Sequence, residues 1–406
     1  MRMCDSLKAS AMKHAEAATN IRKEFYMKTR CNVLFGLLLA ASVYGERMTV
    51  GVIRWDAWFD WSKYSKVSNR YEGYLTPKQW HERLPFYAKV LSNTVVEIRG
   101  DTQDIVDREI EYAAKAGVDY WVFDWYHPKS FVMADGFNYA FNYYRTSEKK
   151  KLLKYCYLLQ SQWLGPKDEW EMTVAGFVSN FQDMQYQKVS GGRPIVYINY
   201  LDEMPKSVDS WKGGKRGFGS WEEARKSLDY LRKRTTDAGL ANPYLVGNIY
   251  YSTWHIKNID ELGLEAVSAY SANSMKAPAD GDGRELPYRE LMKINEERWE
   301  LYKSTGKKVI PPLNTGWDFR AMLVDEKEKA SSSYKGPWFT KPTPEELTEH
   351  VRSAMQWVAR NPDAAEANTI LVYAWDELCE GSWVLVPTLA EGTTRLDALA
   401  KALTGR

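Results

Sequence analysis

The sequence predicts an α/β fold, a single (β/α)₈ TIM barrel, and three observations support this. Eight short apolar runs rich in β-branched and aromatic residues alternate with helical patterns along the chain. Polar residues rarely interrupt these runs, which is typical of a parallel sheet whose outer face is covered by helices. No glycine-rich phosphate loop follows the first run, so an open nucleotide-binding sheet is disfavoured and no nucleotide is expected. Eight strand–helix units instead favour a closed barrel.

The elements follow from these patterns in chain order. The predicted strands are Thr49–Trp55, Tyr120–Trp125, Lys154–Leu159, Ile195–Tyr200, Tyr244–Tyr250, Glu265–Tyr270, Lys308–Leu313 and Thr369–Trp375. Helices are predicted over 104–116, 287–304 and 393–403, and after capping boxes at Ser220–Glu223 and Thr343–Glu346. Proline at position 344 suits the first turn of the last of these helices.

Long segments separate several strands from the helices that follow them. They are Asp56–Gly100, Asp202–Gly219, Ser271–Leu286 and Thr315–Lys341. In a barrel of this type the loops after the strands build the active-site face. We find no internal repeat, so we expect one domain over residues 46–406.

Residues 1–45 are predicted to be an N-terminal extension and a signal peptide. Met27-Lys28-Thr29-Arg30 is a basic start, and the apolar run 33–41 is too short to span a bilayer. Val43 and Gly45 then occupy the positions that signal peptidase reads. We therefore expect export to the periplasm, cell surface or medium, with no membrane span in the mature protein. An N-terminal membrane anchor is the alternative.

Charge and cysteine content narrow the possible partners. Residues 1–45 hold seven of the 55 basic and three of the 53 acidic residues, so the remaining domain has a net charge near −2. Without a basic stripe, no nucleic acid is expected. The histidines are scattered and no C-x-x-C or H-x-x-H occurs, so we predict no metal and no cofactor. With only Cys156 and Cys379 in the domain, stability must come from the core and not from disulfides.

Two carboxylates directly follow the last predicted strand. Glu377 and Glu380 stand three residues apart, between Trp375 and Trp383. Cleavage of a glycosidic bond requires one group that transfers a proton and another that stabilises the reacting sugar. The two glutamates are therefore the candidate catalytic residues of a glycoside hydrolase.

The other predicted strands end in aromatic, amide and acidic residues. Aromatic rings stack on the apolar face of a pyranose, and Asn, Gln and Tyr bond its hydroxyls. We therefore expect an oligo- or polysaccharide substrate in a cleft at this edge, with Asp124 as a supporting acid. The candidate substrate-binding residues are Trp55, Asp56, Trp125, Tyr126, His127, Gln160, Trp163, Asn199, Tyr200, Tyr250, Tyr270, Asn314, Trp317, Asp318, Arg320 and Trp383. For Asp318 and Arg320 a salt bridge at the barrel rim is the alternative.

Three segments resemble the family 99 and family 99-like (WbsX-type) glycoside hydrolase superfamily. Glu377-x-x-Glu380-Gly381, followed by Pro387, is similar to the signature N-E-W-x-E-G-x-x-x-x-P, with one additional residue before the proline. Residues 311–320 are similar to P-G-W-D-x-x-R, and residues 117–126 resemble G-[IV]-x-x-F-x-[FW]-Y. The blocks occur in the family's order, so the resemblance spans residues 48–405. Asp376 stands where the family has asparagine.

The resemblance implies a secreted (β/α)₈ glycosidase that acts inside or at the end of a polysaccharide or glycan. It implies that Glu380 is the acid/base and that Glu377 assists attack of the sugar 2-hydroxyl on the anomeric carbon, with net retention. Burial beside Trp383 and another carboxylate would raise the pKa of such an acid. From the residues alone, retention and inversion stay open, because the outcome depends on the separation of the carboxylates.

Two other functions compete with hydrolysis. A non-catalytic glycan-binding barrel would keep the aromatic residues without needing Glu380. A polysaccharide lyase acting on a uronate would need a base and a cation, for which Arg54, His127 and Arg320 are candidates.

Overall fold

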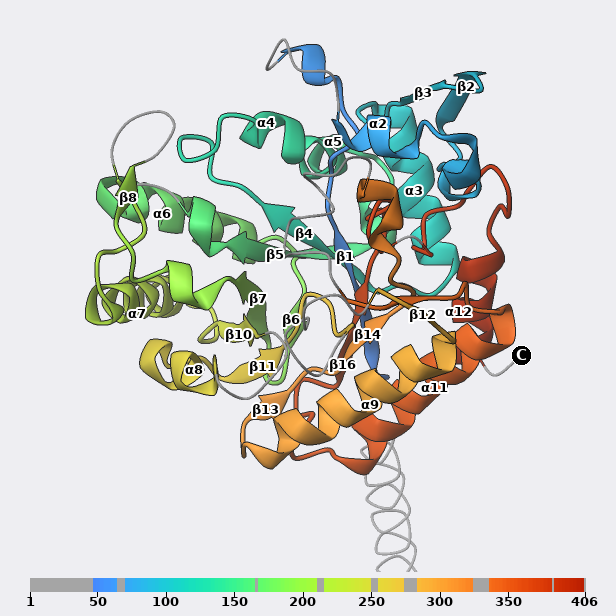
Figure 1. Cartoon of the computed structure of the whole chain (residues 1–406). Helices are drawn as coiled ribbons and strands as arrows, with labels where there is room; N and C mark the ends of the chain where they lie inside the picture. Colours follow the sequence, from blue (N-terminus) through green and yellow to red (C-terminus); the bar gives the residue numbers. More distant parts are fainter. Residues whose placement is uncertain are drawn as a thin grey trace, which may run out of the picture. The chain divides into compact units, whose positions relative to one another are not determined.

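All eight predicted strands form, and they lie in one sheet (Figure 1). The computed structural model describes residues 47–63, 70–164, 167–209, 215–249, 255–273, 283–323, 336–381 and 383–404. The strands are β1 (Thr49–Arg54), β4 (Tyr120–Trp125), β5 (Lys154–Gln160), β7 (Arg193–Asn199), β10 (Tyr244–Asn248), β11 (Ala266–Ser268), β13 (Lys308–Val309), β14 (Pro312–Asn314) and β16 (Thr369–Tyr373). Neighbours among them pair in parallel, which confirms the interpretation of their apolar runs.

The sheet begins and ends on the same short segment, residues 308–314. Its strand order is β13-β11-β10-β7-β5-β4-β1-β16-β14. The Ile310 amide donates to the Val267 carbonyl at 3.0 Å, and the Leu371 amide donates to the Pro311 carbonyl at 3.0 Å. The prediction of one continuous strand over Lys308–Leu313 was wrong in this detail. Two consecutive prolines remove two N–H donors there, so the strand is divided into β13 and β14.

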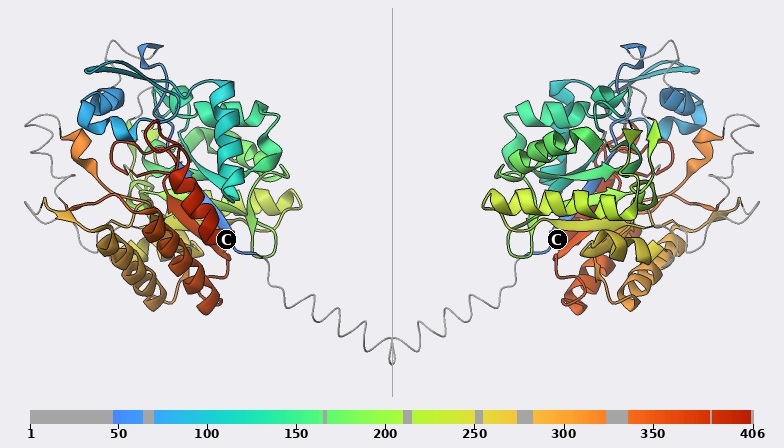
Figure 2. Two further views of the ribbon diagram at one scale, coloured as in Figure 1. Left: turned by 90° about the vertical axis from the view of Figure 1, so that its right-hand side faces the viewer. Right: turned by 90° about the vertical axis from the view of Figure 1, so that its left-hand side faces the viewer.

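Helices lie outside the strands in all three views (Figures 1 and 2). They are α3 (Gln103–Lys115), α4 (Ala134–Phe137), α5 (Tyr139–Thr146), α6 (Trp170–Phe181), α7 (Trp221–Asp237), α8 (Ile256–Leu262), α9 (Tyr288–Ser304), α11 (Pro344–Arg360) and α12 (Thr394–Thr404). The capping box of α11 forms as predicted between Thr343 and Glu346. At α7 the Ser220 side chain accepts from the Glu223 amide at 3.1 Å. In the described part of the chain, no helix has both the length and the apolar character that a membrane span needs.

The long segments after the strands carry smaller elements. Residues 56–100 form η1 (Trp61–Lys63), α2 (Arg70–Leu75), η2 (Lys78–Arg83) and the hairpin β2 (Ala88–Ser92) with β3 (Val95–Ile98). Elsewhere β8 (Val208–Asp209) pairs with β9 (Lys215–Arg216), β12 (Glu285–Leu286) with β15 (Trp338–Phe339), and β6 (Lys188–Val189) with β7. Further 3₁₀ helices are η3 (Lys150–Leu152), η4 (Ser161–Trp163), η5 (Lys167–Glu169), η6 (Leu201–Glu203) and η8 (Phe319–Met322).

Side chains on the strands alternate between the inside of the sheet and the helix layer. On β4 the Tyr120 hydroxyl bonds those of Tyr197 and Thr369 on the inside, at 3.0 and 2.9 Å. Three residues further on, Phe123 points outward and packs on Phe141 of α5, with 5.4 Å between ring centroids. This two-residue period decides which of the residues at a strand end can reach the interior.

Candidate active site

After strand β16 the side chains continue to alternate between the inside of the sheet and the helix layer, so Glu377 points to the inside. Tyr373 packs on Tyr270 with 5.4 Å between ring centroids, and Trp375 points outward and donates from Nε1 to Glu109 of α3 at 3.0 Å. Glu377 faces inward again and is only 4% exposed. The Tyr270 hydroxyl donates a hydrogen bond to its Oε1. A tyrosine at the end of β11 therefore fixes the first candidate glutamate.

A tight turn brings Glu380 back beside Glu377. The Gly381 amide donates to the Glu377 carbonyl at 2.9 Å, and the carboxyl groups of the two glutamates are hydrogen-bonded to each other. A Cβ atom at position 381 would lie 2.9 Å from the Glu377 carbonyl, so the turn needs glycine. The Asp318 amide donates to the Glu380 carbonyl at 2.8 Å. The sequence-predicted pair is thus brought together, with its backbone tied to the loop after β14.

Burial raises the pKa of both glutamates. For Glu377 the neighbouring charges of Glu380 and Asp124 raise the pKa further, while the Tyr270 hydrogen bond opposes the shift. For Glu380 burial is the main cause, and the hydrogen bond with Glu377 opposes it. Such a pair titrates as one unit. Because the pKa of both carboxyls is raised, the pair keeps a proton to higher pH than an ordinary glutamate does, which suits general acid–base chemistry.

A third carboxyl group, Asp124, lies on the floor of the site at the inward face of β4. Gln160 Nε2 donates to both of its oxygens at 2.6 and 2.7 Å, and the Tyr126 hydroxyl donates at 3.2 Å. Trp55 Nε1 in turn donates to the Tyr126 hydroxyl at 2.9 Å. Burial raises the pKa of Asp124 to about 8. Three predicted substrate-binding residues (Trp55, Tyr126 and Gln160) therefore form one network around this acid.

Three other predicted site residues lie outside this floor. Asp56 is buried and accepts from Arg54 Nε at 2.6 Å, in a cluster that includes Glu109. Trp125 packs on Phe177 of α6 with 5.0 Å between ring centroids. His127 is buried, with its ring nitrogens at 3.2 Å from the Thr173 hydroxyl and the Lys129 amide. The period of two along the strand carries Trp125 to the helix layer.

The predicted residues at the end of β14, in the loop after it and at position 383 are mostly buried and stabilise this loop. Asn314 is buried and accepts from the Ala272 amide at 2.8 Å. Asp318 is fully buried, and Arg320 bonds both of its oxygens at 2.8 Å, so this pair forms the salt bridge that was the alternative interpretation. Trp317 packs beside Tyr373 at a ring distance of 6.1 Å, and Trp383 is buried.

The remaining predicted residues that the structure describes lie at or just after the ends of strands β5 and β7. Trp163 is half-buried and packs at a tilt on Phe131, with 4.7 Å between ring centroids. The Arg216 guanidinium lies 4.5 Å from the centre of the Trp163 ring. Asn199 is buried at the end of β7, and Tyr200 after it is 37% exposed with a left-handed φ of 50°. Tyr250 lies outside the described residues.

Arg83, which is buried at the end of η2, was not predicted as a site residue. It donates to the backbone carbonyls of Asp318 and Cys379 at 2.9 and 3.4 Å. It also forms an ion pair with the Asp318 carboxylate. A residue in a long loop, far from any strand end, cannot be connected with Glu380 by spacing.

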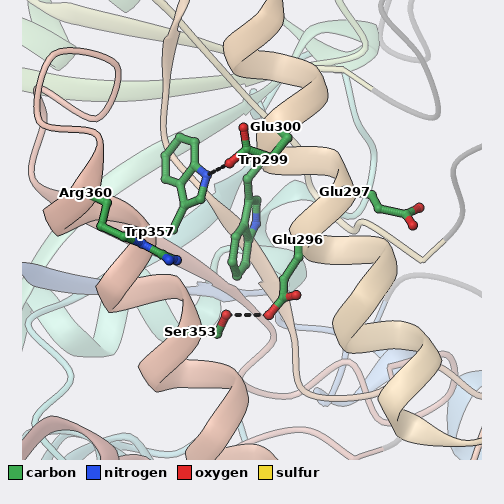
Figure 3. A pocket seen from close by; sticks show the side chains of 7 residues that line it. All are labelled: Glu296, Glu297, Trp299, Glu300, Ser353, Trp357 and Arg360. Atoms are coloured by element: carbon green, nitrogen blue, oxygen red, sulfur yellow. Dashed lines mark hydrogen bonds between the residues drawn. The ribbon is translucent and has the colours of Figure 1, made fainter.

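A separate groove of about 560 Å³ lies between α9 and α11 (Figure 3). Its glutamates are partly engaged by the opposite helix, since Trp357 Nε1 donates to Glu300 at 2.7 Å and the Ser353 hydroxyl donates to Glu296. All its lining residues belong to these two helices and none to a strand end. Among the residues that the structure describes, no three His, Cys, Asp or Glu side chains are grouped to hold a metal ion.

Comparison with known proteins places this chain in a family. A family model described as "Glycosyltransferase WbsX" matches residues 143–399, which is more than half of the chain. The chain belongs to this WbsX family. The resemblance found in the sequence is thereby confirmed. No curated protein matches the sequence of this WbsX-family chain.

Solved structures show which fold the WbsX-family chain shares. A "glycoside hydrolase-like protein" is 13% identical, with a TM-score of 0.56 over 88% of this chain and 94% of that one. The GH99 endo-alpha-mannosidase of Bacteroides thetaiotaomicron, in complex with BIS-TRIS-Propane, is 12% identical, with a TM-score of 0.55 over 87% and 94% of the two chains. A second structure of that enzyme is 11% identical, with a TM-score of 0.53 over 87% and 95%. The chain therefore has a glycoside hydrolase-like α/β fold.

Proposed function

We propose that this protein is a glycoside hydrolase that cleaves a glycosidic bond in a polysaccharide or glycan. The observation that carries the proposal is the hydrogen-bonded pair Glu377 and Glu380 beside the strand ends, with the pKa of both carboxyls raised. Tyr270, two residues after β11, and Asp124 of β4 face the same pair. The fold shared with glycoside hydrolases supports this assignment.

The closeness of the two carboxyl groups favours one form of the reaction. Carboxylates that flank a glycosidic bond stand about 5 Å or more apart. A hydrogen-bonded pair is closer, and it suits two adjacent oxygens of the same sugar, as the family resemblance implies. Glu380 would give its proton to the glycosidic oxygen as the bond to the anomeric carbon breaks. Glu377 would take the proton of the 2-hydroxyl as that oxygen attacks the same carbon.

Water would complete the cycle in the reverse sense. Glu380, now a carboxylate, takes a proton from water as the water oxygen bonds the anomeric carbon. The bond between the 2-oxygen and the anomeric carbon breaks, and Glu377 returns the proton to that oxygen. The two inversions give net retention, and both glutamates regain their starting protonation.

We further propose that the sheet forms a closed barrel and that the domain is exported. Because 308–314 pairs with β11 on one side and β16 on the other, we infer that the sheet closes into a (β/α)₈ barrel. The loops after its strands would then surround Glu377 and Glu380. Cleavage after residue 45 would deliver the domain outside the cytoplasm, where polysaccharide substrates occur.

The family description names a glycosyltransferase, so transfer from an activated sugar is the second candidate function. A hydrolase needs only water as acceptor, and the two activities therefore separate in a reaction without a sugar donor. The lyase alternative loses support, because its candidate cations have partners. Arg54 bonds Asp56 and Glu109, Arg320 bonds Asp318, and burial lowers the pKa of His127.

A glycan screen tests the proposal. The full chain and its Glu380→Gln, Glu377→Gln and Glu171→Gln variants are incubated with a panel of oligo- and polysaccharides, and new reducing ends are measured. Glu171 is an exposed glutamate of α6, so its variant controls for loss of a carboxylate elsewhere. We expect release by the wild type and the control alone.

Each other outcome points to a different function. Equal release by Glu380→Gln would overturn the catalytic assignment. Product that absorbs in the ultraviolet as an unsaturated uronide would indicate a lyase. Turnover only with a nucleotide-activated sugar would indicate a transferase, and binding without release by any variant would indicate a glycan-binding protein.

A further inference from the structure

We propose that Arg83 is a positioning residue that holds Glu380 in its working place through the backbone of two loops. The proposal rests on the proposed function for the role of Glu380, and on the structure for the contacts. Glu380 is half-buried in a turn, outside any strand or helix. Its place therefore depends on the bonds that the backbone of this turn makes.

Arg83 reaches both loops with one guanidinium group. Nη1 donates to the Asp318 carbonyl at 2.9 Å and to the Cys379 carbonyl at 3.4 Å. Nη2 donates to the Asp318 carboxylate. Cys379 directly precedes Glu380, and the Asp318 amide donates to the Glu380 carbonyl at 2.8 Å. Arg83 thus bonds the residue before Glu380 and the residue that bonds Glu380 itself.

Arg320 fixes the other side of Asp318. Its Nε and Nη2 each donate to one carboxylate oxygen at 2.8 Å. The fully buried Asp318 therefore lies between two guanidinium groups and has little freedom to rotate. The ion pair connects segment 78–83, the loop after β14 and the turn 377–381 into one unit.

Two tryptophan rings pack against the Arg83 guanidinium group and restrict its orientation. Trp80, one turn earlier in η2, lies 4.2 Å from it, and Trp383, just after the turn, lies 5.5 Å from it. Cations interact favourably with the face of an indole ring, most strongly where water is excluded. The rings therefore orient Arg83 toward the carbonyls, and Trp383 belongs to this clamp.

Only arginine can make this set of contacts. Its planar group has five N–H donors at fixed angles, whereas lysine offers a compact ammonium group. An Arg83→Lys variant keeps the charge beside Asp318 but cannot bond the carboxylate and both carbonyls together. That variant separates positioning from simple charge balance.

Arg193 provides a matched control at the opposite end of the strands. It donates to the carbonyls of Asn242 and Pro243 at 2.8 and 2.9 Å and to the Glu265 carboxylate at 2.8 Å. Arg193 begins β7, and its carbonyl partners precede β10, so it lies away from the strand ends that carry the site. Arg193→Lys removes the same kind of clamp without touching the Glu380 turn.

Hydrogen exchange of the full chain tests the clamp without any substrate. In Arg83→Lys we expect amide exchange in 316–320 and 378–381 to accelerate by about tenfold or more, because the bonds that protect them open locally. Exchange in the strands should stay as in the wild type. Unchanged exchange in both segments, or equal acceleration throughout the fold, would overturn the clamp.

Turnover on a glycan cleaved in the screen tests the catalytic consequence. An unactivated leaving group needs the proton of Glu380, whereas a dinitrophenyl leaving group does not. For Arg83→Lys we expect kcat on the unactivated glycoside to fall about 10- to 100-fold, with KM nearly constant. The dinitrophenyl glycoside of the same sugar should change by less than about threefold.

The outcomes distinguish failure of the clamp from failure of the proposed function. Equal losses on both glycosides, or equal losses in Arg193→Lys, would assign Arg83 a purely structural role. If Glu380→Gln keeps full turnover while Arg83→Lys accelerates exchange in the two segments, the proposed function fails and the clamp stands.

Discussion

The single side chain of Tyr270 influences the charge of Glu377, because its hydrogen bond stabilises the ionised carboxylate. Without that hydrogen bond the pKa of Glu377 would rise further. In Tyr270→Phe we therefore expect the acidic limb of the kcat/KM profile to move to higher pH. Near neutral pH, kcat/KM should fall about tenfold, since less Glu377 is ionised to accept a proton.

A pH profile of kcat/KM for wild type and Tyr270→Phe is the measurement. Tyr230→Phe, on the outer helix α7, serves as the control. An acidic limb at the same pH in all three proteins would contradict the assignment of Glu377 as a base.

The sequence was informative for this pair because the motif is local. Glu377 and Glu380 lie in one turn after a strand, so spacing alone brings them together. Asp56 and Trp125 lie one residue away from the inward-facing Trp55 and Asp124, and in a strand that single step reverses the face. Arg83 contacts positions 235 and 296 residues away, and no local pattern encodes such contacts.

The turn after β14 packs tightly against the turn after β16, and Gly316 makes this close packing of two elements possible. A Cβ atom at Gly316 would lie 2.6 Å from Cδ1 of Trp383 and 2.9 Å from the Gly381 carbonyl. Gly316→Ala should therefore push the two loops apart. We expect a loss of about 1–3 kcal/mol in the free energy of unfolding, together with lower turnover.

Chemical denaturation of Gly316→Ala beside Gly176→Ala checks this expectation. Gly176 lies in α6, and nothing stands within 4 Å of a Cβ built there. Alanine at that helical position should stabilise the protein by about 0.5–1 kcal/mol. Equal effects of the two substitutions would show that the contact with Trp383 is unimportant.

The elements themselves were largely predictable, for a physical reason. Apolar runs and capping boxes are local signals, and every predicted strand and capped helix formed. The division of the seventh strand follows from two consecutive prolines, which are also a local signal. The pairing of β12 with β15, by contrast, joins segments that lie far apart in the sequence. Such pairing leaves little trace in the local pattern.

Stability of the whole molecule should depend on pH through its buried acids. Burial raises the pKa of Asp124 from 3.8 to about 8 and that of Asp56 to about 7. The folded state then binds more protons than the unfolded state between pH 4 and these values. The free energy of unfolding should therefore decrease as pH rises through this range, by at most about 1.4 kcal/mol per pH unit for each such group.

Asp124→Asn should flatten that decrease between pH 4 and 8. Denaturation curves at pH 5, 6, 7 and 8 measure the slope, with Asp229→Asn as the control, since Asp229 is half exposed on α7. A slope unchanged by Asp124→Asn would mean that Asp124 is ionised in the folded protein.

The predicted signal peptide in residues 1–45 would decide where the whole chain is located. Expressed in a Gram-negative host, the protein should appear outside the cytoplasm with residue 46 as its first residue. N-terminal sequencing of the exported form checks this. A Leu38→Arg variant places a charge in the apolar run and should keep the full-length chain in the cytoplasm.

Cys379 lies between the two catalytic candidates and is buried. Cys156, the other cysteine of the domain, is buried in strand β5. A thiol reagent can therefore reach Cys379 only when the turn opens and Cys156 only when the sheet opens. The ratio of the two labelling rates would report how often the turn opens while the sheet stays intact. The two cysteines can therefore serve as built-in probes, one for local and one for global opening.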